Sequence, residues 1–345
     1  MDDSKPRKQK QVSSDVKKGR NVSDKNAIRI RKNVIFHIRK RNYFALFHIS
    51  CFWLKFSIFS MIIAIQGFRG SFHDEAAHQY FGSAITLCEC ASFREVCSAV
   101  ANGNADKGFM AIENTIAGAI LPNYSLLREF RLQIAGDMIH RIVHNFMVLP
   151  GTPLSAITAI ESHPMALLQC QAFMEQFPHW KHIVSDDTAL SAERIATHRI
   201  TDIGVIAPRG AAELYGLEIL HAGIETDRQN FTRFLAIERG TSFDCSAYDP
   251  ARFQHNSRLT ATIVLQAEQN PLALYQAMDI LRDYGMTYGA IHSIPIIGKP
   301  FVYALCIVTQ FGAYHQLASA SDDMRRSMIQ SDIIGIYPTA DIPPI

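Results

Sequence analysis

The chain has 345 residues, of which 48% are hydrophobic and 19% charged, a composition typical of a globular protein with two or three domains. Its net charge of +2 conceals an asymmetry, because residues 1–42 hold 14 basic and 4 acidic residues. Residues 61–345 keep 19 basic and 28 acidic residues. This acidic balance excludes a basic face for nucleic acid in the globular part.

The seven cysteines are odd in number and form no CxxC pair. Cys88 and Cys90 lie two residues apart, without a second pair that would complete a zinc site. We therefore predict free thiols in a reducing cytoplasm and no bound metal.

The first sixty residues differ from the rest. Residues 1–42 are polar, basic and aperiodic, which predicts disorder. Residues 43–65 form an apolar run long enough to span a bilayer. However, Lys55 lies within this run, and residues 62–66 are needed as the first strand of the globular part. We expect no membrane contact and prefer the hypothesis that Met61 is the native start, with a membrane anchor or a transit-like peptide as alternatives.

Short apolar runs alternate with helical patterns over residues 61–240. The predicted strands are 61–66, 107–113, 141–149, 156–162, 183–184, 203–207 and 232–238. The predicted helices are 73–81, 93–101, 116–130, 163–177, 187–197 and 209–215. Strands that alternate with helices predict an α/β protein with open, mostly parallel sheets. Two such series in succession predict two lobes with a cleft between them.

A linker and a second domain are predicted after this region. Residues 241–257 are polar and rich in turn-forming residues, which is typical of a linker. Strands 260–266, 287–294, 301–309 and 333–337 and helices 271–284 and 314–330 follow. Their order is βαββαβ, so we expect a ferredoxin-like domain over residues 258–338.

Five short motifs lie at the ends of the predicted elements of the first 180 residues of the globular part. They are Gly67-Phe68-Arg69-Gly70-Ser71-Phe72, Ile112-Glu113-Asn114-Thr115-Ile116-Ala117-Gly118, Ser162-His163-Pro164 with Gln169-Cys170, Asp187-Thr188-Ala189, and Asn230-Phe231-Thr232-Arg233-Phe234. In this order and spacing, the set resembles that of prephenate dehydratases. The resemblance implies a two-lobed, periplasmic-binding-protein-like catalytic domain over residues 61–240, followed by a regulatory ACT domain.

The same resemblance implies conversion of prephenate to phenylpyruvate, with loss of water and carbon dioxide, in the biosynthesis of L-phenylalanine. Such a reaction needs a donor aimed at the ring hydroxyl of the substrate and anion-binding donors for its two carboxylates. It needs no metal, redox cofactor or covalent nucleophile. Two alternatives remain open: an arogenate dehydratase, and a non-catalytic two-lobed amino-acid sensor.

The motifs supply candidate residues for each role. Thr232 lies where the family places the threonine that assists departure of the hydroxyl, and Glu113 and Asn114 are the other catalytic candidates. Arg233 is a candidate for a bidentate grip on a carboxylate, although strand alternation puts it on the opposite face from Thr232. The other substrate-binding candidates are Ser71, Thr115, Thr188 and Phe234.

Each of these candidates also has a structural interpretation. Ser71 and Thr188 stand at predicted helix starts, where backbone N–H groups bind anions and where a hydroxyl can equally cap the helix. His163 precedes Pro164 at a third helix start, and we expect it to fix the turn and cap the helix.

The tail resembles an ACT domain of the phenylalanine-sensing kind. Leu272 and Ala273 stand at the start of its first helix, and His292 and Ser293 stand in its second motif, where the family's Glu and Arg are missing. The resemblance implies L-phenylalanine as the effector, bound near these four residues, and a homodimer or homotetramer. The alternative is a tail that serves only as a dimerisation sheet.

Overall fold

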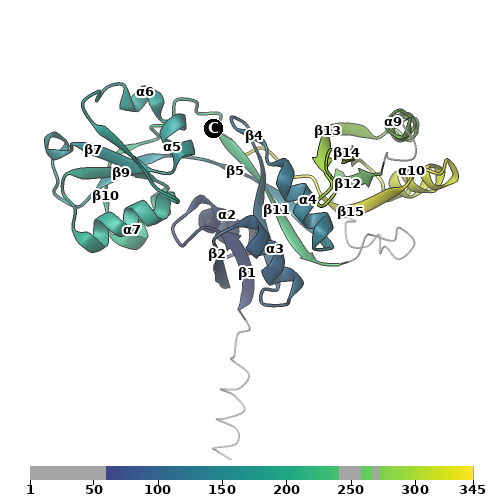
Figure 1. Cartoon of the computed structure of the whole chain (residues 1–345), viewed down its shortest axis with the longest axis horizontal. Helices are drawn as coiled ribbons and strands as arrows, with labels where there is room; N and C mark the ends of the chain where they lie inside the picture. Colours follow the sequence, from purple (N-terminus) through teal and green to yellow (C-terminus); the bar gives the residue numbers. More distant parts are fainter. Residues whose placement is uncertain (1–59, 241–257, 267–271, 345) are drawn as a thin grey trace, which may run out of the picture. The chain divides into compact units, whose positions relative to one another are not determined.

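The structure is a computed structural model that describes residues 60–240, 258–266 and 272–344 (Figure 1). The chain divides into two units, Met1–Phe59 and Ser60–Ile345, and the second is described here. The predictions for residues 1–59 and for the linker at 241–257 lie outside the described residues. Within the described ranges, no helix has the length and apolar character needed to cross a bilayer.

The first lobe is built on a mixed sheet. Its strands are β1 (Met61–Gln66), β2 (Ile85–Cys90), β3 (Lys107–Asn114), β5 (Leu132–Arg141) and β11 (Phe231–Arg239), with the short β4 (Gly118–Ala119) beside β3. The order is β5-β11-β3-β1-β2. β1 runs parallel to β2 and β3, whereas β11 runs antiparallel to β3 and β5. The helices of this lobe are α2 (Phe72–Phe81), α3 (Phe93–Ala101) and α4 (Leu121–Glu129).

The second lobe, on the left of Figure 1, has its own five-stranded sheet in the order β10-β6-β9-β7-β8. The strands are β6 (Asn145–Val148), β7 (Ala159–Ser162), β8 (Lys181–Val184), β9 (Ile203–Ala207) and β10 (Glu218–Ala222). The helical segments are η1 (Leu154–Ala156), α5 (Pro164–Gln169), α6 (Gln171–Met174), α7 (Thr188–His198) and α8 (Arg209–Tyr215). The two-lobed α/β architecture is therefore confirmed, and the sheets are mixed rather than purely parallel.

Residues 259–338 have the predicted βαββαβ order, which confirms the ferredoxin-like arrangement. The elements are β12 (Leu259–Leu265), α9 (Ala273–Asp283), β13 (Thr287–Pro295), β14 (Tyr303–Phe311), α10 (Tyr314–Arg326) and β15 (Ser331–Pro338). We call this segment the C-terminal unit. β15 pairs with β5 of the first lobe at Gly335 and Ile134. Among the described residues, the two parts therefore share one ten-stranded sheet.

The two faces of the C-terminal sheet have different neighbours. Alternate residues of β12, with Ile333 and Ile336 of β15, form a core with α9 and α10. The other face carries Ile294 and Tyr337, which belong to the hydrophobic core of the first lobe. There α4 packs against β13, and the Ser125 hydroxyl donates to the carbonyl of Pro295 at 2.7 Å. The unit's own helices and the first lobe thus cover opposite faces of this sheet, while Tyr288 and Ile291 of the edge strand β13 remain exposed.

Several predicted elements differ from the structure. β2, β5 and β10 were not predicted, and the predicted strand 141–149 spans the end of β5, a connection and β6. The predicted helix 116–130 begins at Leu121, because Asn114 does not cap it. Instead, the Asn114 Oδ1 accepts from the N–H groups of Ile116 and Ala117, which bends the chain directly after β3.

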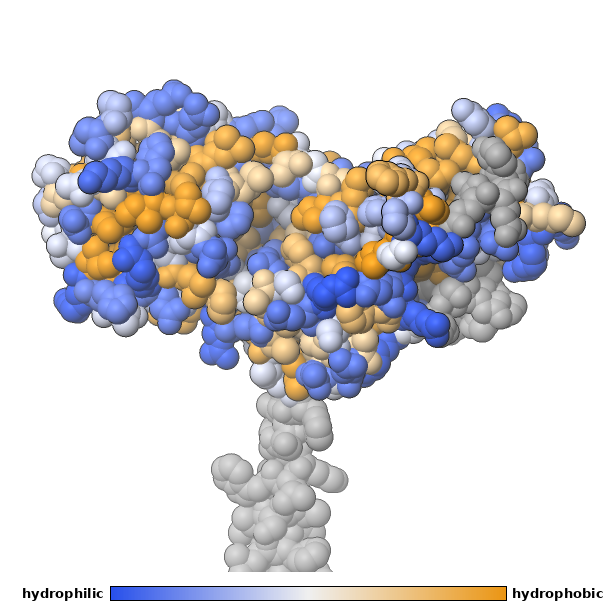
Figure 2. All heavy atoms as spheres, in the orientation of Figure 1, coloured by the Kyte–Doolittle hydropathy of each residue, from blue (hydrophilic) through white to orange (hydrophobic). Residues whose placement is uncertain are grey.

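Large apolar side chains are not confined to the interior. Figure 2 shows several separate apolar groups among hydrophilic residues on the face in view. In the second lobe, Leu168, Val184 and Leu214 are more than half exposed. Scattered exposed side chains of this kind are common on folded proteins and need no special explanation.

Gly204 of β9 offers a test of the packing in the second lobe. A Cβ at this position would lie 2.2 Å from the ring of Phe146, which is fully buried and stacks on Trp180. We expect Gly204→Ala to destabilise the protein by about 1–3 kcal/mol, since an added methyl group in a filled core forces neighbours out of position. Thermal unfolding measures the change.

Gly289 of β13 is a matched control. It also lies in a strand, and its nearest neighbour for an added Cβ is the carbonyl of Val308 at 3.4 Å. Gly289→Ala should leave the melting temperature nearly unchanged. Equal effects of the two substitutions would contradict the packing described around Phe146.

Candidate active site

A cavity of about 330 Å³ is lined by residues from both lobes. The first lobe contributes the start of α2 and the facing ends of β3 and β11. The second lobe contributes the starts of α5 and α7, and His144 lies in the connection between β5 and β6. The lining residues are Gln66, Ser71, Phe72, His73, Phe93, Ala111, Asn114, Ala117, Ile120, Ile142, His144, His163, Met165, Ala166, Gln169, Asp186, Asp187, Thr188, Thr232 and Phe234.

Five of the predicted catalytic and substrate-binding residues meet in this cavity. They are Ser71, Asn114, Thr188, Thr232 and Phe234. All five are largely buried, with exposed fractions between 1% and 9%. Strand alternation places Thr232 and Phe234 on one face of β11, and Asn114 pairs with Thr232 from β3. The spacing of the motifs therefore gathers residues that lie more than 160 positions apart in the sequence.

The glycine-rich turn lets the second lobe approach the first. Gly67 has φ +96°, and a Cβ there would lie 2.9 Å from a carboxylate oxygen of Asp187 and 3.5 Å from the Ser71 Oγ. Gly70 has φ +80°, and a Cβ there would lie 3.0 Å from the Cα of Ala211 in α8. Both positions need a residue that tolerates positive φ and lacks a side chain.

Two helix starts supply N–H groups to the cavity. α2 begins after Ser71, whose Oγ accepts from the N–H of Asp74 at 3.4 Å. α7 begins after Asp187, whose Oδ1 accepts from Ala189 and Leu190 at 2.7 and 3.2 Å. The N–H groups of Asp74, Ala189 and Leu190 are thus already paired, and an anion in the cavity would meet the remaining N–H groups of these first turns. This matters because no lysine or arginine occurs among the described lining residues.

The Asn114 side chain is fully used. Its Oδ1 accepts two backbone N–H groups, as described above, so the other side-chain atom must be the NH₂ group. The two hydrogens of that Nδ2 are shared among three acceptors, the Thr232 Oγ1 at 3.0 Å, the Asn230 Oδ1 at 2.8 Å and the Phe231 carbonyl at 3.1 Å. Because the Thr232 oxygen accepts from Asn114, its own proton remains available to a ligand in the cavity.

The orientation of the Asn114 amide also determines the donors and acceptors from Asn230 to His144. Since the Asn230 Oδ1 accepts from Asn114, its Nδ2 is the donor, and it donates to the Gln169 Oε1 at 2.9 Å. This oxygen also lies 2.8 Å from the His144 Nε2. An oxygen can only accept, so the His144 Nε2 carries the proton. In the neutral ring, the Nδ1 of His144 is then a bare acceptor, and it is buried without a partner in the described structure.

Burial keeps two cavity histidines neutral. Burial lowers the pKa of His144, against the opposing effects of its bond to Gln169 and of the Glu225 charge. Burial and the nearby His140 lower the pKa of His73 to about 4, and its ring packs on Phe93 and Phe234. By contrast, burial raises the pKa of Asp187, although the two capping N–H bonds and His163 oppose the shift. The third cavity histidine, His163, caps α5 through its Nδ1, as predicted.

Three predicted residues do not reach the cavity. Arg233 points to the other side of the sheet, where its guanidinium binds the Asp137 carboxylate at 2.6 and 2.9 Å, so it does not grip a substrate here. Glu113 pairs with Arg233 across β3 and β11 and shares its face. The Thr115 hydroxyl donates to the Gln229 carbonyl and accepts from the Phe231 N–H, which uses it within the protein.

The four predicted effector residues are divided between different surroundings. Ala273 is the buried first residue of α9, and Leu272 precedes it and is 58% exposed. His292 faces the first lobe, with its ring 5.5 Å from that of Tyr124. Ser293 follows His292 on β13 and therefore points to the opposite face. Residues 267–271, which hold the rest of the first effector motif, lie outside the described ranges.

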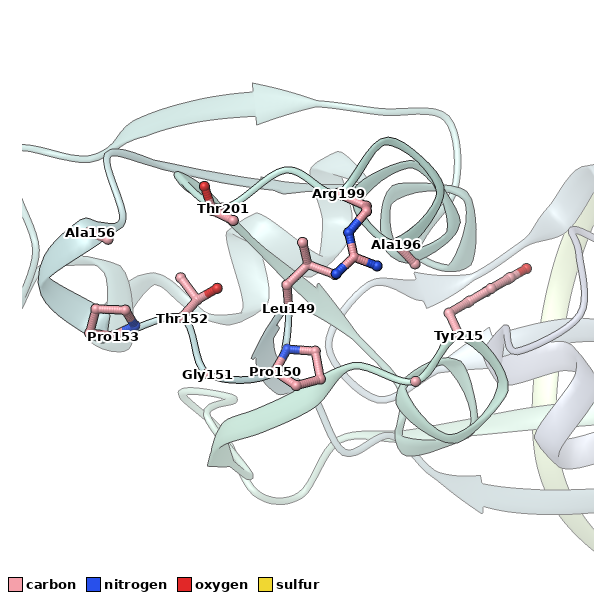
Figure 3. A pocket seen from close by; sticks show the side chains of 11 residues that line it. Leu149, Pro150, Gly151, Thr152, Pro153, Ala156, Ala196, Arg199, Thr201 and Tyr215 are labelled. Atoms are coloured by element: carbon pink, nitrogen blue, oxygen red, sulfur yellow. The ribbon is translucent and has the colours of Figure 1, made fainter.

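A second hollow of about 590 Å³ lies entirely within the second lobe (Figure 3). It is lined by the turn at 149–153, the end of α7 and Tyr215 of α8, and Figure 3 shows the Arg199 side chain between Leu149 and Ala196. None of the predicted site residues lines it. The cavity between the lobes is therefore the candidate active site.

The predicted set missed three residues of the cavity network. Gln169 and Asn230 belong to the quoted motifs, so their place in the sequence was a signal, but amides carry no obvious chemical role by themselves. His144 lies in no motif, within the run 141–149 that was predicted as a single strand, and the structure places it between β5 and β6. Sequence reasoning had no signal for it, because its position depends on contacts with Gln169 and Phe72 from separate elements.

The tautomer of His144 can be tested directly. We expect a neutral ring with the proton on Nε2 and none on Nδ1, because Gln169 offers only an acceptor. Nitrogen-15 NMR of the imidazole distinguishes the two tautomers. In Gln169→Glu, the added carboxylate should raise the pKa of His144. A proton on Nδ1 of the neutral ring in the unsubstituted protein would contradict the network.

Comparisons with known proteins point to one family. The family model for prephenate dehydratase matches residues 63–242. The bifunctional chorismate mutase/prephenate dehydratase of Escherichia coli K12 is 30% identical over 298 residues, which cover 84% of this chain and 74% of that protein. Arogenate dehydratase 1 of Petunia hybrida is 37% identical over 181 residues, which cover 51% of this chain and 42% of that protein.

Two solved structures are similar over most of the chain. One, called GqqA and described as a novel type of quorum quenching acylase, is 28% identical with a TM-score of 0.68, covering 82% of this chain and 98% of that chain. The other, prephenate dehydratase from Arthrobacter aurescens in complex with L-Phe, has a TM-score of 0.70 at 24% identity, covering 83% and 92%, and shares the fold. The family model and the relatives of similar sequence show that this chain belongs to the prephenate dehydratase family.

Proposed function

We propose that the protein converts prephenate to phenylpyruvate, water and carbon dioxide in the biosynthesis of L-phenylalanine. The observation that carries this proposal is the Asn114–Thr232 pair at the cavity wall. The Thr232 hydroxyl accepts from Asn114 and can donate to a ligand. That is the donor which departure of a ring hydroxyl requires.

The ring of the substrate supplies much of the driving force. Loss of carbon dioxide and hydroxide leaves an aromatic product, so the protein has to assist the leaving group and hold the two carboxylates. Thr232 is a weak acid, and its contribution is a hydrogen bond that strengthens as charge develops on the departing oxygen. The partner Asn114 holds the threonine in place, because its own side chain is fixed by backbone N–H groups.

The carboxylates of the substrate bind at the helix starts in this proposal. Ser71 and the first turn of α2 form one anion site, and Thr188 at the first turn of α7 forms the other. The two starts come from different lobes, as a substrate with carboxylates at two ends requires. Phe234 and Phe93 provide apolar surface for the ring.

Arogenate is the second candidate substrate, because arogenate dehydratase 1 of Petunia hybrida is 37% identical over 181 residues. The two substrates differ in the keto or amino group of the side chain. His144 does not decide between them, because its Nδ1 is buried away from the cavity surface.

The acylase activity described for GqqA fits the cavity less well. Hydrolysis of an amide by a serine or threonine needs a base that hydrogen-bonds the hydroxyl. In the described structure, the hydroxyls of Ser71 and Thr232 bind the N–H of Asp74 and the Asn114 amide, and neither is joined to a histidine.

Turnover by the purified protein tests the proposal. We expect phenylpyruvate from prephenate, and a comparison of kcat/KM with arogenate decides between the two substrates. Thr232→Val removes the hydroxyl at nearly constant volume and should lower kcat by about 10²–10³-fold, as for the loss of one donor to developing charge.

Thr232→Ser is the matched control, because it keeps the hydroxyl and should retain most of the activity. A folded wild-type protein that turns over neither substrate would refute the proposed function. Wild-type kcat in folded Thr232→Val would instead refute the role assigned to the threonine.

As part of this proposal, the C-terminal unit binds L-phenylalanine as an effector, and the chain forms a homodimer or homotetramer. We expect L-phenylalanine to lower the rate and to raise the melting temperature, since a ligand at 100 times its Kd adds about 2.7 kcal/mol of stability. Calorimetry on His292→Leu tests whether β13 contributes. An unchanged rate and melting temperature would show that the unit does not sense phenylalanine.

A further inference from the structure

Arg233 follows Thr232 in the sequence but serves a different part of the molecule. Its Nε and one terminal nitrogen donate to the Asp137 Oδ2 at 2.9 and 2.6 Å. The side chains are 19% and 2% exposed. Asp137 lies on β5, next to β11 in the sheet. The pair therefore anchors β11 one residue away from Thr232, on the face opposite the cavity.

The C-terminal unit completes this anchor. The same Arg233 nitrogen lies 3.4 Å from the hydroxyl oxygen of Tyr337 on β15. Since arginine only donates, this oxygen accepts from Arg233, and its proton is available to Thr262 of β12, 2.8 Å away. The second oxygen of Asp137 accepts from the N–H of Ala340, beyond β15, at 3.1 Å. Both partners of the ion pair are thus held by residues of the last 85 positions of the chain.

The surroundings make this cluster stiff. Tyr337 is 1% exposed and belongs to the core that joins the first lobe to the C-terminal unit. Burial raises the pKa of Asp137, against the Arg233 charge and hydrogen bonds, which lower it. A buried carboxylate that depends on its partners resists displacement of any one of them.

We propose that Arg233 is a positioning residue, through which Asp137 and Tyr337 couple the C-terminal unit to the placement of the Thr232 hydroxyl. A movement of β15 against β5 displaces Tyr337 and Ala340, and with them the guanidinium of Arg233. Because Thr232 is the adjacent residue on the same strand, its hydroxyl moves relative to the cavity. A displacement near 1 Å at a reacting group can cost about 100-fold in rate.

The test uses Tyr337→Phe in the full-length protein. The measurement of kcat and KM rests on the proposed function. The substitution keeps the ring and removes the hydroxyl beside Arg233. We expect kcat to fall about 10-fold with KM nearly unchanged, since Thr232 acts on the departing group. Asp137→Asn should act in the same direction, and Arg233→Lys should retain more activity than Arg233→Met.

A double-mutant cycle separates positioning from a general loss of structure. If Tyr337 acts through Thr232, adding Tyr337→Phe to Thr232→Val should leave kcat unchanged, because the hydroxyl that it positions is gone. Losses that multiply in the double variant would overturn the proposal. Wild-type kcat in folded Tyr337→Phe would also overturn it.

A matched control lies at the other end of β11. Glu238 forms an ion pair with Lys107 of β3, and Glu238→Gln removes that pair without touching the residues beside Thr232. It should leave kcat unchanged even where it lowers the melting temperature. A fall in kcat equal to that of Tyr337→Phe would contradict a specific role for the Arg233 cluster.

Hydrogen exchange provides a readout that does not depend on turnover. The N–H of Thr115 donates to the Phe231 carbonyl at the start of β11. Tyr337→Phe should speed exchange at this amide, and Glu238→Gln should not. If the protein turns over neither substrate, the proposed function fails, but faster exchange at Thr115 would still support the coupling. Unchanged exchange at Thr115 in Tyr337→Phe would overturn it.

Discussion

The antiparallel pairing of β11 with β3 is the constraint on which the site depends. It sets Thr232 opposite Asn114, and the period of two along a strand then sends Arg233 and Glu113 to the other face. A slip by one residue would turn the threonine away from the cavity and the arginine into it. The bonds from Asn114 and Thr115 to the Phe231 carbonyl fix this register at the end of the pair that carries the chemistry.

No lysine or arginine occurs in the described lining of the cavity. A bound anion would therefore lack a basic side chain as its partner. The cavity's charged lining residues are Asp186 and Asp187, and the histidines whose pKa burial lowers are neutral at pH 7. Attraction for carboxylates must therefore come from backbone N–H groups and hydroxyls. Such dipoles are fixed by the fold and need little reorganisation when a ligand binds. The neutral network from Asn114 to His144 is likewise fixed by the fold. The two backbone N–H groups that bind Asn114 determine the orientation of every amide in it.

Sequence reasoning was strongest where a local pattern decides the outcome. The strands at 61–66 and 203–207 and the helices at 93–101 and 209–215 have the predicted bounds. β5 was missed because Gly136 and Asp137 interrupt its apolar residues, and both residue types are uncommon in strands. The motifs located Thr232 and Asn114. Strand alternation had already put Arg233 on the opposite face from Thr232. What the sequence did not show is its partner Asp137, which lies 96 residues away.

The division of the site between the lobes separates two tasks. Asn114 and Thr232 both belong to the sheet of the first lobe, so their hydrogen bond does not depend on how the lobes meet. The two helix starts belong to different lobes, and contacts between the lobes hold them together. The Gly210 N–H donates to the Glu75 carboxylate at 2.7 Å, and Gly70 lies against Ala211. If the carboxylates bind as proposed, separation of the lobes would remove one carboxylate site and leave the Thr232 hydroxyl in place, so binding of both carboxylates requires the lobes to be together.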